Sequence, residues 1–391
     1  MSDSGSGSRL PWAAADPYSF YATRRTEGPV VWDERAGAWL VLGYAEARQV
    51  LAGPGWTSDP LAAPGVRDAA DPLAVEFTGR TMLFADGATH RRLRGSLRDV
   101  FAPGFIAGLT DGIDAVLDDL LDSLPAGAEV DFAADVALPL PLAVIGAWLD
   151  LDDGATAALQ ELSPSVIRAL GAFADGAEIA AGAAAAAALT GMFLPLAADR
   201  RAHPGDDLLS YLATDPDLEL DDVVANALLL AVAGHETTAN VLGAGIVRLL
   251  SSAAPVPAGP PSGRSDARLV AELLRLDAPA QAVARTAEEE HEIAGVTIAA
   301  GDAVLVVIAA ANRDPAVFVE PDTLLPEREG PPTLSFGHGA HFCLGAALAR
   351  LELEHALPRV LARAPRLSGP VAWRDTPAVR GPVSVPVVFD R

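Results

Sequence analysis

The stretch Ser335–Glu354 reads SFGHGAHFCLGAALARLELE, and it holds Cys343, the only cysteine in the 391-residue chain. Three glycines and two histidines crowd the residues around this cysteine. Leucines then recur at helical spacing among charged residues, which predicts an amphipathic helix. We therefore expect a glycine-rich loop that delivers one thiolate to a helix start, where free N–H groups and the positive end of the helix dipole stabilise the anion.

Three interpretations of Cys343 compete. It could be a buried small hydrophobic residue, as free cysteines often are, but this leaves the clustered glycines unexplained. It could bind zinc together with His338 and His341, although a second cysteine and the usual ligand spacings are missing. It could instead be the axial ligand of a haem iron, because the surrounding glycines would let a flat macrocycle lie against the backbone.

The string FGHGAHFCLG resembles the haem-binding loop of the cytochrome P-450 family, in which Phe-Gly-x-Gly is followed by a basic residue and Cys-x-Gly. The matching positions are Phe336, Gly337, Gly339, His341, Cys343 and Gly345. The resemblance implies that Cys343 ligates the iron of haem b (iron protoporphyrin IX) and that the other members of this loop contact the cofactor. It also implies a mainly α (α+β) fold, a single domain over residues 29–391 with a large helical lobe and a small β-rich lobe, after an N-terminal tail and lead-in at residues 1–28.

Leu220–Leu250 forms one long apolar pattern, with acidic residues at its start and Arg248 near its end. This pattern predicts a long buried helix. Polar residues from His235 to Asn240 interrupt it just after Gly234. They could be a satisfied polar network in the core, or a local opening of the helix that holds water and relays protons.

Residues 233–238 read AGHETT, which resembles the central-helix motif of the same family: a small residue, glycine, any residue, an acid and threonine. By that match, Glu236 and Thr237 supply protons for oxygen activation. Ala233 and Gly234 make room over the iron.

A candidate anion site lies between residues 86 and 98. His90 and Arg94 are four residues apart and share one helix face, which suits a carboxylate ligand, although a solvated basic face has the same spacing. The resemblance implies that His90 and Arg94, together with Arg285 and His341, hold the haem propionates.

Arg91, Arg92 and Arg98 lie around the same predicted helix, in a chain whose formal charge is -24. We expect this cluster to dock an acidic electron donor, because complementary charge speeds encounter. For soluble bacterial members the family pattern implies a ferredoxin and its ferredoxin reductase. The overall negative charge argues against a nucleic-acid partner.

Glu272 and Arg275 are three residues apart on a predicted helix, a spacing that carries little information alone. At this distance before the cysteine loop they resemble the buried Glu–Arg structural pair of the family, whose third partner is an arginine matched here by Arg328. Leu324 and Leu325 replace the usual Phe and Asp of that segment.

The remaining pattern predicts mostly short elements. We expect two strands in Pro29–Tyr44, helices over Glu46–Leu51, Pro103–Leu124, Leu138–Leu149 and Ala155–Ala198 (with breaks near Ser163–Pro164 and Gly171), and an irregular segment over Trp56–Phe84. We also expect a turn and then a helix from Pro204, a loop over Ala253–Ser265, an extended segment at Ala280–Val283, a strand over Val304–Ile308, a kink at Pro358 and a final hairpin over Arg380–Pro386.

The compartment is inferred from three features. One cysteine excludes an intramolecular disulfide and fits a reducing, cytoplasmic compartment. The first twelve residues lack an apolar signal core, and Ala177–Ala198, although alanine-rich, carries Glu178 and Pro195 and is interpreted as a helix of a soluble protein, without a membrane. All basic residues other than histidine are arginine, which indicates a high-GC bacterial source.

The resemblance implies a haem-thiolate monooxygenase that inserts one atom of O2 into a small-molecule substrate by hydroxylation or epoxidation, in bacterial secondary metabolism, and acts as a monomer. Expected pocket positions in Trp56–Phe84, Ala280–Val283, Leu230, Ala233 and Val383 are mostly small or apolar, which predicts a largely apolar substrate, free or bound to a carrier protein. Alternatives are oxidative coupling, peroxide-driven oxidation, or a haem-binding recruitment domain without turnover; an intact cysteine, Glu236 and Thr237 argue against the last two.

Overall fold

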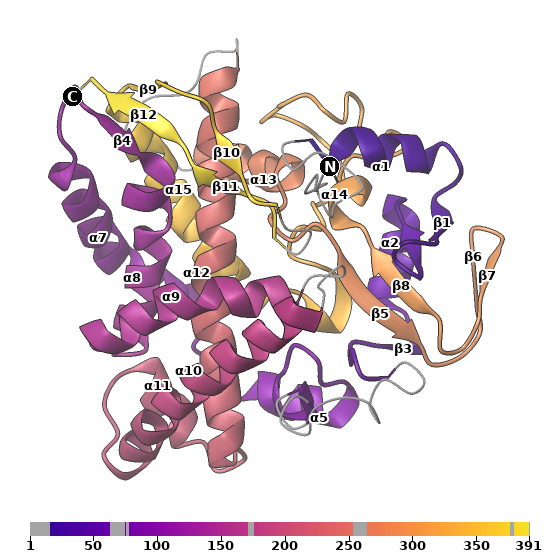
Figure 1. Ribbon diagram of the computed structural model, residues 1–391, viewed down its shortest axis with the longest axis horizontal. Helices are drawn as coiled ribbons and strands as arrows, with labels where there is room; N and C mark the ends of the chain where they lie inside the picture. Colours follow the sequence, from indigo (N-terminus) through magenta and orange to yellow (C-terminus); the bar gives the residue numbers. More distant parts are fainter. Residues whose placement is uncertain are drawn as a thin grey trace, which may run out of the picture.

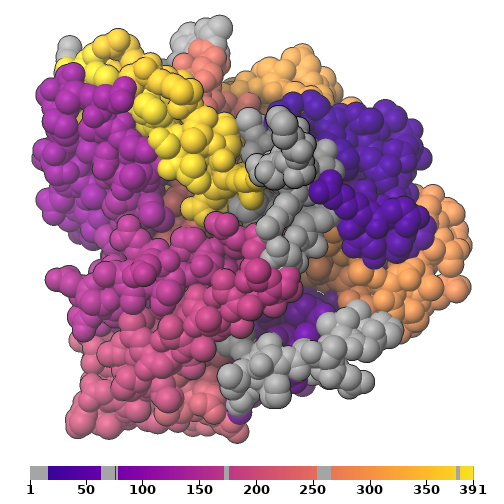
Figure 2. Space-filling view, viewed as in Figure 1, coloured from indigo at the N-terminus to yellow at the C-terminus, as the bar shows by residue number. Residues whose placement is uncertain are grey.

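The computed structural model describes residues 16–62, 75, 78–170, 176–252, 264–375 and 379–390. A helical lobe lies beside a smaller lobe rich in β-structure, and helix α12 (Leu220–Ser251) runs through the helical lobe (Figure 1). In Figure 2 the magenta and rose helices of the first lobe stand beside the indigo and orange segments of the second. The predicted mainly α (α+β) fold, with a large helical lobe and a small β-rich lobe, is confirmed.

The other helices are α1 (Tyr18–Arg25), α2 (Tyr44–Ala52), α5 (Gly87–Gly95), α6 (Pro103–Ile106), η1 (Ala107–Leu109), α7 (Thr110–Ser123), η2 (Ala133–Ala137), α8 (Pro139–Trp148), α9 (Asp153–Ala169), α10 (Gly176–Ala202), α11 (Leu208–Ala213), α13 (Arg264–Leu276), α14 (Ile308–Ala311), η3 (Gly339–His341) and α15 (Ala346–Ala362). Those predicted over residues 46–51, 103–124 and 138–149 are all present.

Strands β1 (Val30–Asp33), β2 (Ala38–Val41), β8 (Ala303–Val306), β5 (Val283–Ala287) and β3 (Trp56–Thr57) form a five-stranded sheet in that order. In this sheet β2 and β8 are parallel, with Trp39 opposite Val304, and the other pairs are antiparallel. A three-stranded sheet has the order β4 (Glu129–Asp131), β12 (Pro386–Phe389), β9 (Pro365–Leu367). Two further ribbons pair β10 (Ala372–Trp373) with β11 (Pro382–Ser384) and β6 (His291–Ile293) with β7 (Val296–Ile298).

Helix α12 is the axis of the larger core. Glu219 and Asp222 form a capping box at its start, which satisfies two backbone N–H groups that a helix end leaves free. Helices α8, α9, α10 and α15 pack against it, and 22 of its 32 residues are buried. At ~1.5 Å per residue, this 32-residue helix is about 48 Å long. It therefore provides a rigid support on which a site in the middle of the molecule can be built.

Helix α10 is the one helix among the described residues that is long and apolar enough to cross a membrane, by length and composition alone. It packs instead along α9 and α12. Ala185, Leu189, Phe193 and Ala197 recur every four residues and form a buried stripe. Burial of a side chain such as Phe193 contributes roughly 2 kcal/mol, so this stripe gives α10 a role in the folded core.

Several predicted boundaries were wrong. Helix α9 continues through Ser163 and Pro164, where a break was expected, and the Ser163 hydroxyl donates to the Leu159 carbonyl in that turn. The predicted strand Val304–Ile308 ends at Val306 because α14 begins at Ile308. Helix α15 continues through Pro358 to Ala362, and the kink expected at Pro358 stays a prediction.

The predicted final hairpin is also wrong in its pairing. Strand β11 pairs with β10, whereas β12 pairs with β4 and β9, so Arg380–Pro386 passes from one sheet to another. Of the expected irregular segment over residues 56–84, Trp56 and Thr57 form β3, and residues 63–74 and 76–77 lie outside the described residues. The expected break at Gly171 also lies outside them, as does the expected loop up to residue 263; its last two residues begin α13.

The predicted cluster of Glu272, Arg275 and Arg328 is confirmed. The Glu272 carboxylate lies 2.7 Å from Nη2 of Arg275 and 3.0 Å from Nε of Arg328, and all three side chains are buried. The Leu325 amide also donates to Glu272, at 3.1 Å. Arg275 donates further to the carbonyls of Asn312, Pro321 and Thr323. The cluster therefore ties α13 to the irregular segment that leads into the Cys343 loop.

Candidate active site around Cys343

Backbone hydrogen bonds fold the Cys343 loop. The Gly337 amide donates to the Leu334 carbonyl, and the Cys343 amide donates to the Phe336 carbonyl, each at 2.7 Å. Helix η3 lies between these two bonds, and α15 begins at Ala346. The predicted loop that delivers a cysteine to a helix start is therefore observed.

The three glycines of the loop are required, or leave space, for different structural reasons. Gly339 has a φ of +76°, and a Cβ there would stand 2.6 Å from the Leu51 carbonyl oxygen of α2. Gly337 also has a positive φ, +73°. Nothing lies within 4 Å of the position that a Cβ of Gly345 would take. Space for a macrocycle against the backbone is therefore present at Gly345, whereas turn conformation and packing against α2 account for Gly339.

The Cys343 thiol is exposed to a solvent-sized space although protein surrounds it. Burial raises the pKa of this thiol, while the Gly345 amide and the guanidinium groups of Arg94 and Arg350 favour the thiolate and lower it. Arg350 in turn lies over the Phe336 ring, 4.6 Å from its centroid. A thiol that is both surrounded and accessible borders an internal space, which contradicts the interpretation of Cys343 as a packed core residue.

His90 and His341 stack beside this loop, with ring centroids 4.2 Å apart. His341 Nε2 lies 2.9 Å from Asp86 Oδ1 and 3.1 Å from Ser58 Oγ. His90 is buried, and its Nε2 has no hydrogen-bond partner. Burial and the neighbouring His341 and Arg94 lower the pKa of His90 to about 4, so its ring is neutral near pH 7 and able to donate one hydrogen bond to an anion.

Arg94 and Arg285 form no ion pair with a described carboxylate. Arg94 Nη2 donates to the Phe342 carbonyl at 2.6 Å, and Arg285 Nη1 donates to the Ala284 carbonyl at 2.7 Å. Burial lowers the pKa of both arginines. Buried charge is costly without a counter-ion. These two guanidinium groups and the unpartnered nitrogen of His90 therefore fit a ligand that carries carboxylates, as a haem does through its propionates.

The motif residues of α12 divide between the core and an open side. His235, Glu236 and Thr238 are buried, whereas Ala233 is exposed in the middle of the helix and Thr237 is half-buried. The Thr237 hydroxyl donates to the Ala233 carbonyl at 3.0 Å. Helix α12 is continuous through this turn, and the predicted local opening that holds water stays a prediction.

Gly234 is half-buried, and a Cβ there would lie 3.4 Å from Ile145 of α8. Its missing side chain therefore leaves room for α8. The open position on this turn of α12 is Ala233.

The Glu236 side chain lies against the β10–β11 ribbon. Its Oε2 lies 3.1 Å from Nη1 of Arg374, which follows β10. Its Oε1 lies 3.8 Å from His235 Nε2, and His235 Nδ1 lies 2.7 Å from the Ala231 carbonyl. Burial lowers the pKa of His235, so the ring is neutral and Arg374 is the charged partner of Glu236.

The predicted zinc alternative is wrong. Within the described ranges, no group of three or more His, Cys, Asp and Glu side chains could hold a metal ion. His338 lies beside Arg48 instead, with Nε2 3.4 Å from Arg48 Nε.

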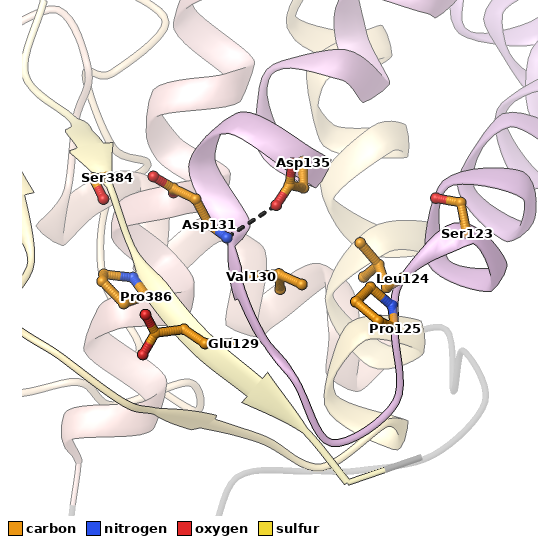
Figure 3. A pocket seen from close by; sticks show the side chains of 9 residues that line it. All are labelled: Ser123, Leu124, Pro125, Glu129, Val130, Asp131, Asp135, Ser384 and Pro386. Atoms are coloured by element: carbon orange, nitrogen blue, oxygen red, sulfur yellow. Dashed lines mark hydrogen bonds between the residues drawn. The ribbon is translucent and has the colours of Figure 1, made fainter.

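A separate pocket of about 560 Å³ lies between β4, η2 and the C-terminal strands, lined by acidic residues such as Asp131 and Asp135 (Figure 3). None of the predicted site residues lines it.

Three arginines were predicted to dock an electron donor, and they have different surroundings. Arg92 lies 2.8 Å from the buried Asp222 carboxylate and donates to the Asp217 carbonyl, so it stabilises the start of α12. Arg98 lies 3.1 Å from Asp99, and both side chains are largely exposed. Arg91 is exposed and forms no ion pair with a described residue.

Sequence reasoning missed Asp86, Arg374 and Glu352. Asp86 directly precedes α5, so its place beside that helix could have been recognised from the sequence. Glu352 lies on the buried face of α15 and bonds the Thr238 side chain of α12. Arg374 and Glu236 are far apart in the chain, and no local spacing signals their contact.

Comparison with known proteins agrees with this geometry. A Cytochrome P450 family model matches residues 267–363. The cytochrome P450 monooxygenase PikC of Streptomyces venezuelae is 34% identical over 97% of this chain and 92% of its own length. The 6-deoxyerythronolide B hydroxylase of Saccharopolyspora erythraea is 34% identical over 96% of each chain. The structure of P450BioI in complex with an acyl carrier protein ligated to hexadec-9Z-enoic acid matches with a TM-score of 0.88 and 30% identity, over 96% of this chain and 99% of that one. This chain therefore belongs to the cytochrome P450 family and is a monooxygenase with a haem b cofactor.

Proposed function

We propose that this monooxygenase hydroxylates or epoxidises a small, largely apolar organic substrate in bacterial secondary metabolism. The observation that carries the proposal is the pairing on α12 of a buried acid, Glu236, with a hydroxyl, Thr237, that borders open space. Such a pair can pass protons from the buried carboxylate of Glu236 to the hydroxyl of Thr237 and from there to the open side of the helix. A haem protein without turnover would not need it.

Residues around the loop would hold the cofactor. Cys343 is the proposed axial ligand, and Phe336, Gly337 and Gly345 lie around it in the same loop. His90, Arg94, Arg285 and His341 would bind the propionates; the first three have donors or charge without a described carboxylate partner. His341 already pairs with Asp86, so it would share its ring between that carboxylate and the cofactor. Haem b, when bound, supplies O2 activation and oxygen-atom transfer.

The protein's own contribution to the chemistry is proton supply and exclusion of water. Thr237 would present its hydroxyl to the reacting oxygen, and Glu236 would return the proton that the hydroxyl gives up. Ala233 would leave the space in which substrate and O2 meet, and Gly234 would let α8 approach this turn of α12. Burial of Glu236 within the core limits the entry of bulk water, so protons arrive through side chains.

The residues that we propose to line the substrate side of the site have small and apolar side chains. Ala233 and Ala284 are exposed, Ala280, Ala282 and Val283 are half-buried, and Val383 is 51% exposed. Small side chains leave room, and their apolar surface favours an apolar ligand. A relative is named as a hydroxylase of 6-deoxyerythronolide B, a small organic molecule. We propose a small, largely apolar substrate for this chain.

Delivery of the substrate by a carrier protein is a narrower possibility that one experiment decides. P450BioI was solved with an acyl carrier protein that bears its ligand. Titration of the ferric enzyme with free terpenoids, steroids, polyketides and aromatics should shift the haem Soret band when a ligand displaces iron-bound water. A shift with a free compound supports a free substrate. A normal thiolate-haem spectrum with no shift, followed by a shift with carrier-bound acyl chains, supports a carrier-bound one.

The reaction type is tested with isotopically labelled O2 and a reconstituted ferredoxin system. We expect one labelled oxygen atom in the product, and Thr237→Ala should lower the product formed per NADH several-fold. Thr237→Ser is the matched control, because it keeps the hydroxyl and should retain most of the yield. Unlabelled product, or an unchanged yield in Thr237→Ala, would overturn the proposed proton supply.

A further inference from the structure

We infer that Arg374 is a positioning residue for Glu236, and that it determines when this carboxylate can serve Thr237. The inference rests on the proposed proton-supply function of Glu236 and Thr237 and identifies the group that controls it. Arg374 lies on the β10–β11 ribbon, outside the helix that bears the acid–alcohol pair.

The charge balance around Glu236 leaves it dependent on Arg374. The Glu236 side chain is 1% exposed, and a buried carboxylate needs a paired cation. His235 lies 3.8 Å away, but burial lowers the pKa of its ring and keeps it neutral. Among the described residues, Arg374 at 3.1 Å is the only charged cation paired with this carboxylate.

The contact is an ion pair without good hydrogen-bond geometry. Glu236 Oε2 and Arg374 Nε are both buried atoms that lack a hydrogen-bond partner among the described residues. A carboxylate held by charge alone keeps its place while Arg374 is near, yet no directional bonds resist its rotation. Neighbouring side chains on a helix point about 100° apart, so Glu236 must rotate away from Arg374 before it can approach the Thr237 hydroxyl.

The ribbon that carries Arg374 is fitted onto α12 beside Glu236. A Cβ at Gly381 would lie 1.9 Å from Asn240 Oδ1, so only glycine allows this approach. The Asn240 side chain donates to the Glu236 carbonyl at 2.5 Å, and the Arg374 amide donates to the Gly381 carbonyl at 3.0 Å. Arg374 is thus bonded to Gly381 within the ribbon, Glu236 is bonded to Asn240 within α12, and the close contact of Gly381 with Asn240 places the two partners side by side.

The same ribbon reaches the proposed substrate side. Val383 of β11 is 51% exposed and lies two residues beyond Gly381. On the other strand, Trp373 lies under the Arg380 guanidinium, 4.0 Å from the ring centroid, and Arg380 pairs with Asp277 at 3.3 Å. A ligand that contacts β11 therefore acts on a short, anchored ribbon that holds the cation of Glu236. Substrate binding and proton supply are coupled through Arg374.

The ion pair itself is tested by a double-mutant cycle on chemical denaturation of the haem-loaded protein. Arg374→Gln and Glu236→Gln should each lower the denaturation midpoint, and the double variant should lose clearly less than their sum. The control is Arg366→Gln, which breaks the exposed Arg366–Asp390 pair (2.8 Å) and should be additive with Glu236→Gln. Additivity of Arg374→Gln with Glu236→Gln would overturn the inference.

The functional part is tested by product formed per NADH at saturating substrate. Arg374→Gln should lower this yield several-fold with an unchanged substrate-induced spectral shift, whereas Arg374→Lys, which keeps the charge, should restore much of it. If Arg374→Gln does not fold, Arg374→Met, which keeps much of the side-chain volume without the charge, carries the test and should lower the yield several-fold. If the effects of the two substitutions on the denaturation midpoint are not additive but Arg374→Gln forms as much product per NADH as the wild type, the ion pair is only structural, which contradicts the inference. A wild-type protein without a thiolate-haem spectrum would instead mean that the proposed function has failed.

Discussion

His341 Nε2 lies 2.9 Å from Asp86 Oδ1 and links the Cys343 loop to the start of α5. Asp86 also accepts hydrogen bonds from the Ser58 amide at 2.7 Å and the Thr57 hydroxyl at 2.8 Å. Burial by itself would raise the pKa of Asp86, but these three hydrogen bonds lower it to about 2. One carboxylate thus joins the loop, α5 and the segment after β3.

This arrangement predicts a loss of stability in acid. The folded-state pKa of Asp86 lies below its ordinary value of 3.8, so the carboxylate stabilises the fold above about pH 4, and this contribution is lost as the pH falls toward about 2. Asp86→Asn should lower the free energy of unfolding by roughly 1 kcal/mol near neutral pH, after allowance for its partial exposure. Denaturant titrations between about pH 7 and pH 3 should show this difference shrinking in acid. A difference that stays constant would contradict the assignment.

The buried carboxyl group of Glu352 predicts the opposite dependence of stability on pH. Burial raises its pKa to about 8, although a hydrogen bond with Thr238 lowers it in part, and Oε2 has no partner. The folded protein therefore keeps a proton that the unfolded chain releases above its ordinary pKa of 4.5, and stability falls as the pH rises from about 4.5 to about 8.

Glu352→Gln removes this ionisable group from the core. The substitution should raise the free energy of unfolding near pH 8, relative to its effect near pH 4.5, by roughly 4 kcal/mol. Glu290→Gln, at an exposed position, is the matched control and should show a flat profile. Denaturant titrations of both variants between about pH 4.5 and pH 8 measure whether the effect of each substitution depends on pH. An effect of Glu352→Gln that does not depend on pH would show that the carboxyl is ionised in the fold.

A single substitution in the Glu272 cluster, Glu272→Gln, should lower stability strongly, because it replaces one carboxylate oxygen with an amide nitrogen. Glu272→Gln leaves the guanidinium groups of Arg275 and Arg328 buried without their counter-ion, which should cost about 3–5 kcal/mol. The control is Arg268→Gln on the same helix, because its pair with Glu327 is largely exposed and should contribute less than about 1 kcal/mol. Equal losses in the two variants, measured by chemical denaturation, would show that burial does not distinguish the pairs.

The docking surface predicts a change in reduction rate. Arg91→Glu and Arg98→Glu should slow reduction by an acidic ferredoxin several-fold at low salt and flatten its salt dependence. Arg92 is left unchanged, because its bond to the buried Asp222 would confound binding with folding. Arg366→Glu tests whether charge reversal elsewhere has the same effect. Stopped-flow reduction at several salt concentrations makes the comparison, and unchanged rates would exclude this surface as the docking site.

Local sequence patterns predicted the features that depend on local spacing. The glycine-rich loop, α12 and the Glu272–Arg275 pair all follow from residues within a few turns of each other, and the structure has all three. The contacts of His341 with Asp86 and of Glu236 with Arg374 join segments that are distant in the chain, and no periodicity marks them. The break expected at Pro164 is absent for another reason: the proline ring removes one backbone donor, yet tertiary packing holds α9 together across it.

The central claim is that Cys343 is the thiolate ligand of haem b in this chain. The most direct measurement is the optical spectrum of the reduced, carbon monoxide-treated protein, recorded for the wild type and for Cys343→Ala. We predict the red-shifted Soret band of thiolate-ligated haem in the wild type and its absence in Cys343→Ala. A wild-type spectrum without this band, or a variant that retains it, would contradict the account.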